Sequence, residues 1–289
     1  MRPFLLSAVL AAGAIVAPAI SAQQAPTNDA PNPYRTIEGW AKMPEGRTWG
    51  STSAVAIDKD GVSIWVAERC SQNDCVGSPL DPVLHFDKDG KLVKSFGAGM
   101  IRSPHGIHVD RDGNVWVVDC ACTGAGGGAR GGRGAAAAAP PVITDGHQIH
   151  KFSPDGKHLM SLGKAGGDTS QAGYLYQPNN MTTAPNGDIW VVQGHSSQAG
   201  VSPAAVFRFD KTGKFLGRWG TVYDPAHNDE PYAFNQPHAI AFDSRGRLFI
   251  ADRGNDRLKI FDPANNMKLL DTWYQFSRIS GLYIDGNDV

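Results

Sequence analysis

The chain has 289 residues, 34 of them glycine, and a formal net charge of −1 at pH 7. A near-neutral chain has no general electrostatic attraction to nucleic acid or to an anionic membrane surface, so we expect neither as a partner. The length suffices for one large or two ordinary domains, and the many glycines are typical of an all-β protein with many tight turns.

The first 22 residues are typical of a secretory signal peptide. Arg2 supplies a positive start, a mostly apolar run extends from Phe4 to Val16, and small residues end the segment at Ala22. The apolar run is short for a membrane span, and no later stretch of the sequence is long enough to be one. We therefore predict a periplasmic or secreted protein in which residues 23–33 form a polar, proline-rich linker.

Residues 34–289 are predicted to form one β-propeller domain. After one expected strand at 34–40, a phrase of two alternating apolar runs around an Asp-x-Asp-Gly-type turn recurs, most clearly at 103–119. Asp and Gly are hairpin turn residues, and a second hairpin completes each unit. The second strand of every unit carries one large aromatic residue, namely Trp65, Trp116, Trp190 and Phe249. Repeated units of four antiparallel strands predict propeller blades.

One position recurs at the start of every unit. It is occupied by Ser53, His105, Asn179, His238 and, in a fifth unit that opens near 279, Ser280. Val289 lies early in that fifth unit, so we expect a C-terminally truncated propeller of about four and a quarter blades. Residues 123–141 are rich in Gly and Ala without periodicity, which predicts a disordered insert in the second unit.

The turns, the Pro-His starts of 104–105 and 237–238, and the stretch at 251–262 resemble the NHL repeat over about residues 53–289. The order of the motifs VAER, SPHGIHVD, QPN, QPHAIAFD and ADR is similar to that of the peptidyl-α-hydroxyglycine α-amidating lyases. This resemblance implies a six-bladed propeller that cleaves an α-hydroxyglycine-extended peptide into a peptide amide and glyoxylate. It also implies a zinc ion in the central channel and a calcium ion nearby.

Two other functions stay open at this point. The first is a non-catalytic NHL propeller that binds a peptide or protein ligand on its loop face. The second is a lactonase-like hydrolase, which is disfavoured because such sites use channel carboxylates. The four repeat positions carry Ser, His, Asn and His instead.

His105 and His238 are the candidate zinc ligands. Each begins the innermost strand of its unit, and inner-strand residues line a propeller channel. Three histidines and one open position make a catalytic zinc site. The two residues belong to alternate blades, so a sixth blade, expected beyond Val289, would supply the third histidine, as the resemblance also implies. The alternative is that both histidines make structural hydrogen bonds.

Arg69 and Arg253 each follow the second strand of a unit. The resemblance implies that they lie near the substrate, where a guanidinium group can hold a carboxylate or polarise an oxygen atom. The alternative is a surface ion pair, for instance with Glu68 or Asp252.

The resemblance assigns roles to three more residues. His195 matches a position that carries a tyrosine in the family, proposed to remove a proton from the substrate hydroxyl. A histidine can serve as a base near neutral pH, or it can cap a loop. Val55 and Ile107 match positions whose backbone carbonyl groups bind calcium.

The four cysteines are predicted to form disulfides, because export permits them. Cys70 and Cys75 are the favoured pair. Cys120 and Cys122 are too close in sequence for an easy mutual bridge, so pairing with Cys70 and Cys75 stays open. A four-thiolate zinc site is the alternative, although the C-x4-C and C-x-C spacings are poor for zinc.

Overall fold

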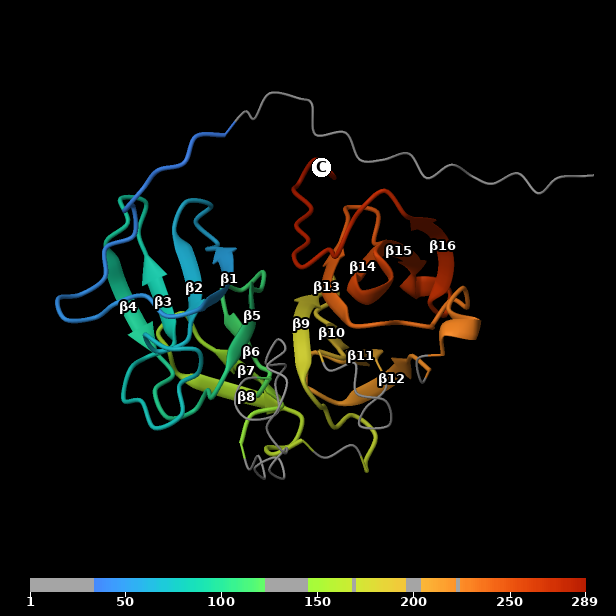
Figure 1. Cartoon of the computed structure of the whole chain (residues 1–289), viewed down its shortest axis with the longest axis horizontal. Coiled ribbons are helices and arrows are strands. Elements are labelled where there is room, and N and C mark those ends of the chain that lie inside the picture. The colour runs from blue at the N-terminus through green and yellow to red at the C-terminus, as the bar shows by residue number, and fades with distance from the viewer. Residues whose placement is uncertain (1–33, 123–144, 168–169, 196–203, 222–223) are drawn as a thin grey trace, which may run out of the picture.

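The computed structural model describes residues 34–122, 145–167, 170–195, 204–221 and 224–289. The predicted signal peptide, the linker at 23–33 and the insert at 123–141 lie outside these residues. The described part contains four antiparallel sheets of four strands each, and in every sheet the strands pair in sequence order (Figure 1). No helix in this part of the chain is long and apolar enough to cross a membrane.

The four sheets follow one another along the chain. The first contains β1 (Thr52–Ile57), β2 (Ile64–Glu68), β3 (Val83–Phe86) and β4 (Leu92–Phe96). The second contains β5 (Pro104–Val109), β6 (Val115–Asp119), β7 (Gln148–Phe152) and β8 (His158–Leu162). The third contains β9 (Pro178–Thr183), β10 (Ile189–Gln193), β11 (Ala205–Phe209) and β12 (Phe215–Trp219). The fourth contains β13 (Pro237–Phe242), β14 (Leu248–Asp252), β15 (Arg257–Asp262) and β16 (Lys268–Trp273). These sheets confirm the predicted blades.

The predicted Asp-Gly turns close the hairpins because the Asp side chain binds the backbone of the turn. Between β5 and β6, Asp110 Oδ1 accepts hydrogen bonds from the N–H groups of Asp112 at 3.0 Å and Asn114 at 2.8 Å. Gly113 donates its N–H to the Asp110 carbonyl at 2.9 Å, with a φ of +86° that favours glycine.

The second strand of each blade lies in the hydrophobic core. Every residue of β6, β10 and β14 is buried. The predicted aromatic ladder packs blade against blade, because Trp65 joins core residues of the second blade and Trp116 joins those of the third. Large aromatic side chains bury much apolar area, so the ladder holds neighbouring blades at a fixed spacing.

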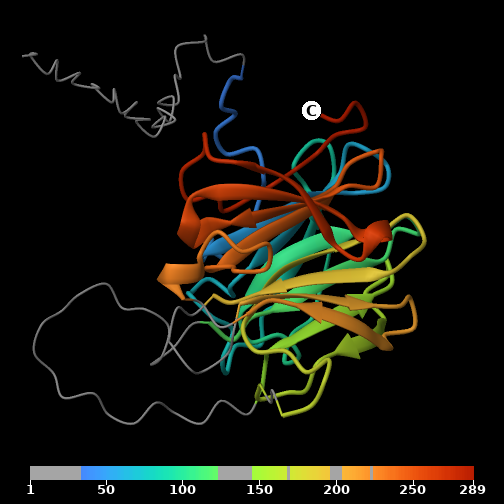
Figure 2. The same ribbon diagram turned by 90° about the vertical axis from the view of Figure 1, so that its right-hand side faces the viewer.

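The first strands of the blades lie around the central axis. β1 contacts β5, β5 contacts β9 and β9 contacts β13. Figure 1 shows the four sheets following one another in an arc, and Figure 2 shows the same sheets from the side. Because the first strands contact one another, side chains from several blades can meet at the ends of these strands.

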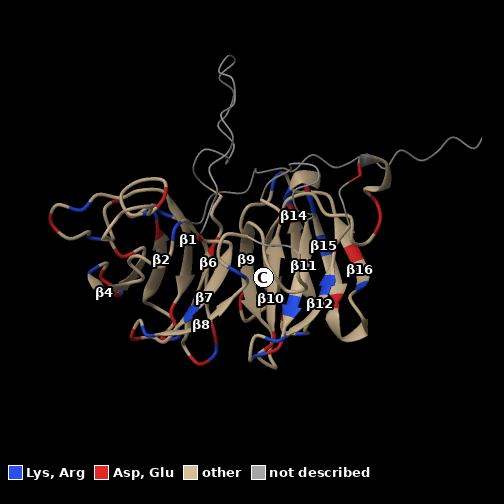
Figure 3. Ribbon diagram, turned by 90° about the horizontal axis from the view of Figure 1, so that it is seen from below, with Lys and Arg blue, Asp and Glu red and all other residues tan. Residues whose placement is uncertain are grey.

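Lysine and arginine residues lie interspersed with aspartate and glutamate, mostly at the turns (Figure 3).

Two predicted strands are absent from the described residues. Residues 34–40 form none; Trp40 Nε1 donates to the Lys88 carbonyl at 3.2 Å and the Lys42 N–H to the Gly90 carbonyl at 2.7 Å. This segment therefore contacts the β3–β4 turn rather than a sheet edge. Residues 279–289 also form no strand, and Asp288 is hydrogen-bonded to Ser244 in the β13–β14 turn.

The cysteines form two local disulfides. Cys70 is bonded to Cys75, which confirms the favoured pair. Cys120 is bonded to Cys122, so the expectation that these two are too close in sequence was wrong. The reason is the backbone of Ala121, whose φ of +49° turns the chain between the two cysteines. This pairing also excludes cross-linking between the two groups in the structure.

Candidate metal centre

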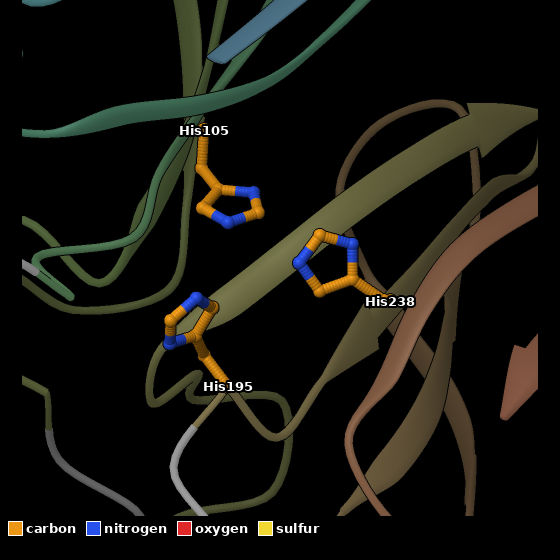
Figure 4. A group of neighbouring side chains, drawn as sticks. All are labelled: His105, His195 and His238. Carbon is orange, nitrogen blue, oxygen red and sulfur yellow. The ribbon is translucent and has the colours of Figure 1, made fainter. Parts of the chain in front are cut away.

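Three histidines from three blades meet near the ends of the inner strands (Figure 4). His105 is the second residue of β5, His238 is the second residue of β13, and His195 lies two residues after β10. The ring centroids are 4.9 Å apart for His105 and His238, 5.1 Å for His105 and His195, and 5.9 Å for His195 and His238. One potential ligand nitrogen of each ring lies within 4.8 Å of the others.

A β-bulge at each repeat position aims the side chain at the axis. In each first strand the pairing register with the second strand shifts at this position, so that the repeat residue has no opposite partner. The unpaired residues include Ser53, His105, Asn179 and His238. Bulges bend a strand and redirect a side chain, which explains why the repeat positions converge.

Hydrogen bonds between blades orient two of the three rings. His105 Nδ1 lies 2.8 Å from the Asn179 carbonyl oxygen, and His238 Nδ1 lies 2.8 Å from the Ser280 carbonyl oxygen. A carbonyl oxygen can only accept, so Nδ1 carries the hydrogen in both rings. Both Nε2 lone pairs are therefore free, in the arrangement that metal-binding histidines usually adopt.

Asn179 occupies the same repeat position in the third blade. Its side-chain Nδ2 donates to the Pro237 carbonyl at 2.6 Å, while its own carbonyl accepts from His105. His105 and Asn179 thus each bind the next blade, whereas His238 binds the segment that follows the fourth blade. The repeat pattern places Asn179 at this position, but the residue type alone does not predict that it links two blades.

Burial keeps the three imidazoles neutral. It lowers the pKa of His195 and of His238 to about 4, and that of His105 well below its usual range. Arginine charges lower these pKa values further, from Arg69, Arg253 and Arg278. Near pH 7 the three neutral rings can each offer a nitrogen lone pair to a metal ion, and the positive charges of the surrounding arginines favour the binding of an anionic ligand.

The two predicted arginines lie beside this cluster. Arg69 donates from Nε to the Pro104 carbonyl at 3.1 Å and from Nη1 to Asn73 Oδ1 at 3.1 Å. The buried Nε of Arg253 has no hydrogen-bond partner among the described residues.

The predicted alternative partners of these arginines are bound elsewhere. Glu68 pairs with Arg47 at 2.6 Å and Asp252 pairs with Arg257 at 2.7 Å. The two carboxylates named as surface partners are therefore committed to other guanidinium groups.

The structure places the predicted calcium-binding residues on adjacent inner strands. Val55 lies on β1, where it is 63% exposed, and Ile107 lies on β5, where it is buried. β1 and β5 are in contact. The calcium site stays a prediction.

Four-stranded blades around an axis, with repeat positions that converge on it, define a β-propeller. The NHL repeat family model matches residues 234–261, which include β13 and β14. The chain thus forms a β-propeller with an NHL repeat at residues 234–261, and it resembles the peptidyl-α-hydroxyglycine α-amidating lyases.

Two known proteins illustrate this similarity. Human NHL repeat-containing protein 3 is 27% identical over 234 residues, which are 79% of this chain and 56% of that protein. Peptidyl-α-hydroxyglycine α-amidating lyase 2 of Drosophila melanogaster is 24% identical over 250 residues, 81% of this chain and 52% of the relative. The chain thus spans about half the length of these two relatives.

A solved structure shares the fold. A gluconolactonase of Xanthomonas campestris superposes with a TM-score of 0.50 at 18% identity, covering 82% of this chain and 66% of that chain. At this identity the likeness concerns the fold alone.

Proposed function

We propose that this propeller is an exported, metal-dependent lyase that cleaves an α-hydroxyglycine-type substrate into an amide and glyoxylate. In this reaction the bond between the α-carbon and the amide nitrogen breaks, the hydroxyl oxygen becomes the aldehyde oxygen, and the hydroxyl proton ends on the amide nitrogen. The observation that carries the proposal is the cluster of three neutral imidazoles ringed by arginines.

His105, His195 and His238 would hold the metal, and zinc is the ion we propose. The fit rests on three points: the short mutual distances of the ligand atoms, the free Nε2 lone pairs of His105 and His238, and the neutral state of all three rings. When bound, zinc supplies a Lewis acid that polarises the substrate hydroxyl. The sequence led us to expect that His195 takes a proton from the substrate. If the nitrogen lone pair of His195 instead binds the metal, that lone pair cannot also accept the proton, so metal ligation replaces the expected role.

The arginines would bind the substrate carboxylate. Arg253 has an unpartnered buried Nε, and its charge and that of Arg69 both act on His195. A guanidinium group matches the planar geometry of a carboxylate. Arg69 and Arg253 would therefore orient the α-carbon toward the three-histidine cluster. A calcium ion held by the carbonyl groups of Val55 and Ile107 belongs to the same proposal and would stabilise the inner strands.

The test measures zinc content and glyoxylate release with the full chain. We expect about one zinc per disulfide-bonded chain and glyoxylate release from an α-hydroxyglycine peptide that stops on chelation and returns with zinc. His238→Asn should lower zinc affinity by at least about 100-fold, whereas the exposed His227→Asn should leave it unchanged. A folded chain that binds no zinc would overturn the proposal. Zinc binding without glyoxylate release would instead favour a ligand-binding propeller.

A further inference from the structure

A second group of metal-ligand atoms lies beside the three-histidine cluster. The sulfur atoms of Cys120 and Cys122 and one nitrogen of His195 lie within 4.8 Å of one another. Both cysteines are buried, with 0% and 5% of their surface exposed. We infer that, in its dithiol form, this pair binds a soft metal ion, Zn²⁺ or Cu⁺, together with His195. This site goes beyond the proposed function and shares one ligand with it.

Cys120 stands where two other blades carry a site arginine. It directly follows β6, just as Arg69 follows β2 and Arg253 follows β14. Its N–H donates to the Ser103 carbonyl at 3.1 Å, in parallel with the Arg69 N–H, which donates to the Ser51 carbonyl at 3.1 Å. The second blade therefore places a thiol at the level of the channel at which the first and fourth blades each place a guanidinium group.

The backbone around Ala121 is held firmly, which keeps the two sulfur atoms together. Ala121 has a φ of +49° and is 1% exposed. A side chain at Gly146 would come within 2.6 Å of the Ala121 Cβ atom, so glycine there allows close packing of the two segments. The carboxylate of Asp119 accepts the backbone N–H groups of Arg102 and Ser103 at 2.9 Å and 2.8 Å, which anchors the end of β6.

The ring of His195 is suited to serve two neighbouring sites. Figure 4 shows that one ring nitrogen points toward His105 and His238, whereas the other points away from them. Thiolates select soft ions such as Cu⁺ and Zn²⁺, and two cysteines with one histidine form a known three-ligand zinc set. Neither candidate group of ligands includes a carboxylate, which disfavours hard ions such as Mg²⁺ and Ca²⁺ at both places.

Access to the second site depends on the redox state of the cysteines. In the structure Cys120 and Cys122 are disulfide-bonded. A dithiol reductant supplies two electrons and two protons to the disulfide and itself becomes a disulfide, which leaves two thiols on the chain. Metal binding then displaces the two thiol protons, because the thiolate is the ligand. When both sites are filled, His195 binds through both ring nitrogens and also releases its N–H proton, so that it bridges the two ions as an imidazolate. The oxidised chain thus has the three-histidine site alone, and the reduced chain has both.

Titration with Co²⁺ tests this inference, because thiolate ligands give cobalt a near-ultraviolet charge-transfer band that imidazoles do not. The background variant carries Cys70→Ser and Cys75→Ser, which removes the other disulfide. It is reduced with a dithiol and freed of reductant without air. We expect one Co²⁺ and no band in the oxidised chain, and a second Co²⁺ with the band after reduction.

Two further variants separate this site from the first one. Cys122→Ser should lose the band and the second equivalent while it keeps the first, which also shows that it is folded. His195→Ala should weaken the thiolate-linked binding at least tenfold. A reduced chain without the band, a band unchanged in Cys122→Ser, or unchanged affinity in His195→Ala would overturn the inference. A band in the reduced chain with no Co²⁺ bound by the oxidised chain would instead count against the proposed function alone.

Discussion

At the scale of single residues, hydrogen bonding decides what each histidine can do. His105 and His238 donate from Nδ1 to carbonyl groups, which leaves Nε2 as a ligand. His147 does the opposite: its Nδ1 accepts the Gln177 N–H at 2.9 Å, and its ring stacks on Tyr176. A protonated ring would lose this acceptor, so His147 must remain neutral to hold the segment before β9.

His147 should make the protein sensitive to acid. Burial lowers its pKa to about 4, and the Arg102 charge adds to the shift. Because the folded pKa lies below the unfolded value of about 6.5, this stability is complete above pH 6.5 and decreases as the pH falls toward 4. The loss reaches about 3 kcal/mol near pH 4. His147→Asn keeps an acceptor, tolerates the φ of +59° and does not titrate.

Urea unfolding between about pH 4 and pH 7 measures this effect. The unfolding free energy of His147→Asn should fall by about 3 kcal/mol less than that of the wild type over this range. His227→Asn is the control, because His227 is exposed and its hydrogen bond is to the neighbouring Asp224. Parallel pH curves for the wild type and His147→Asn would contradict the assignment.

At the scale of elements, the hairpins followed from the sequence and the bulges did not. Alternating apolar residues and Asp-Gly turns determine strand pairs locally, so the sequence predicted the four blades and the buried Trp116 correctly. A bulge depends on the register between two strands, which the residues at 104–107 do not reveal. The convergence of His105 and His238 could be predicted from the repeat, whereas the way each ring is aimed could not.

Gly106 tests how closely neighbouring inner strands approach. A Cβ atom at this position would lie 2.8 Å from Asn180 Oδ1 and 2.9 Å from the Asn179 carbonyl oxygen, which is the acceptor of His105. Gly106→Ala should therefore push β5 away from β9 and displace the His105 ring. We expect a loss of about 1–3 kcal/mol in the unfolding free energy, and weaker zinc binding.

Gly281→Ala is the matched control, because no atom lies within 4 Å of its added Cβ and its φ is not in the left-handed region. Urea unfolding and a zinc titration of both variants measure the effect. If the unfolding free energy of Gly106→Ala lies within about 0.5 kcal/mol of that of the control, and the zinc affinities are equal, β5 and β9 do not pack as closely as we infer.

At the scale of the whole molecule, the site depends on three blades at once. From the sequence we predicted two ligands in alternate blades and a third beyond Val289, because the prediction considered only the position that recurs at the start of each unit. His195 lies instead two residues beyond β10, yet its ring faces the other two. Only the packing of blade on blade brings the three rings together, since 133 residues separate His105 from His238 in sequence. Contacts of that range leave no local signal.

This arrangement predicts that zinc stabilises the entire fold. The strands of each blade contact mainly those of the neighbouring blades, and such repeats gain stability mainly from the interfaces between them. A metal ion held by the second, third and fourth blades binds the folded chain alone and adds about 4 kcal/mol at a thousandfold excess over its dissociation constant. For a chain of this size the thermal midpoint should rise by roughly 8–16 °C.

Thermal unfolding of the disulfide-bonded chain, with zinc or with Mg²⁺, measures this shift. Zinc should raise the midpoint of the wild type and of His227→Asn, but not that of His238→Asn, which lacks one of the three ligands. Mg²⁺ should have no effect, because it prefers oxygen ligands. An equal zinc shift in His238→Asn would mean that the stabilising ion binds elsewhere, and the three-blade site would then lose its support.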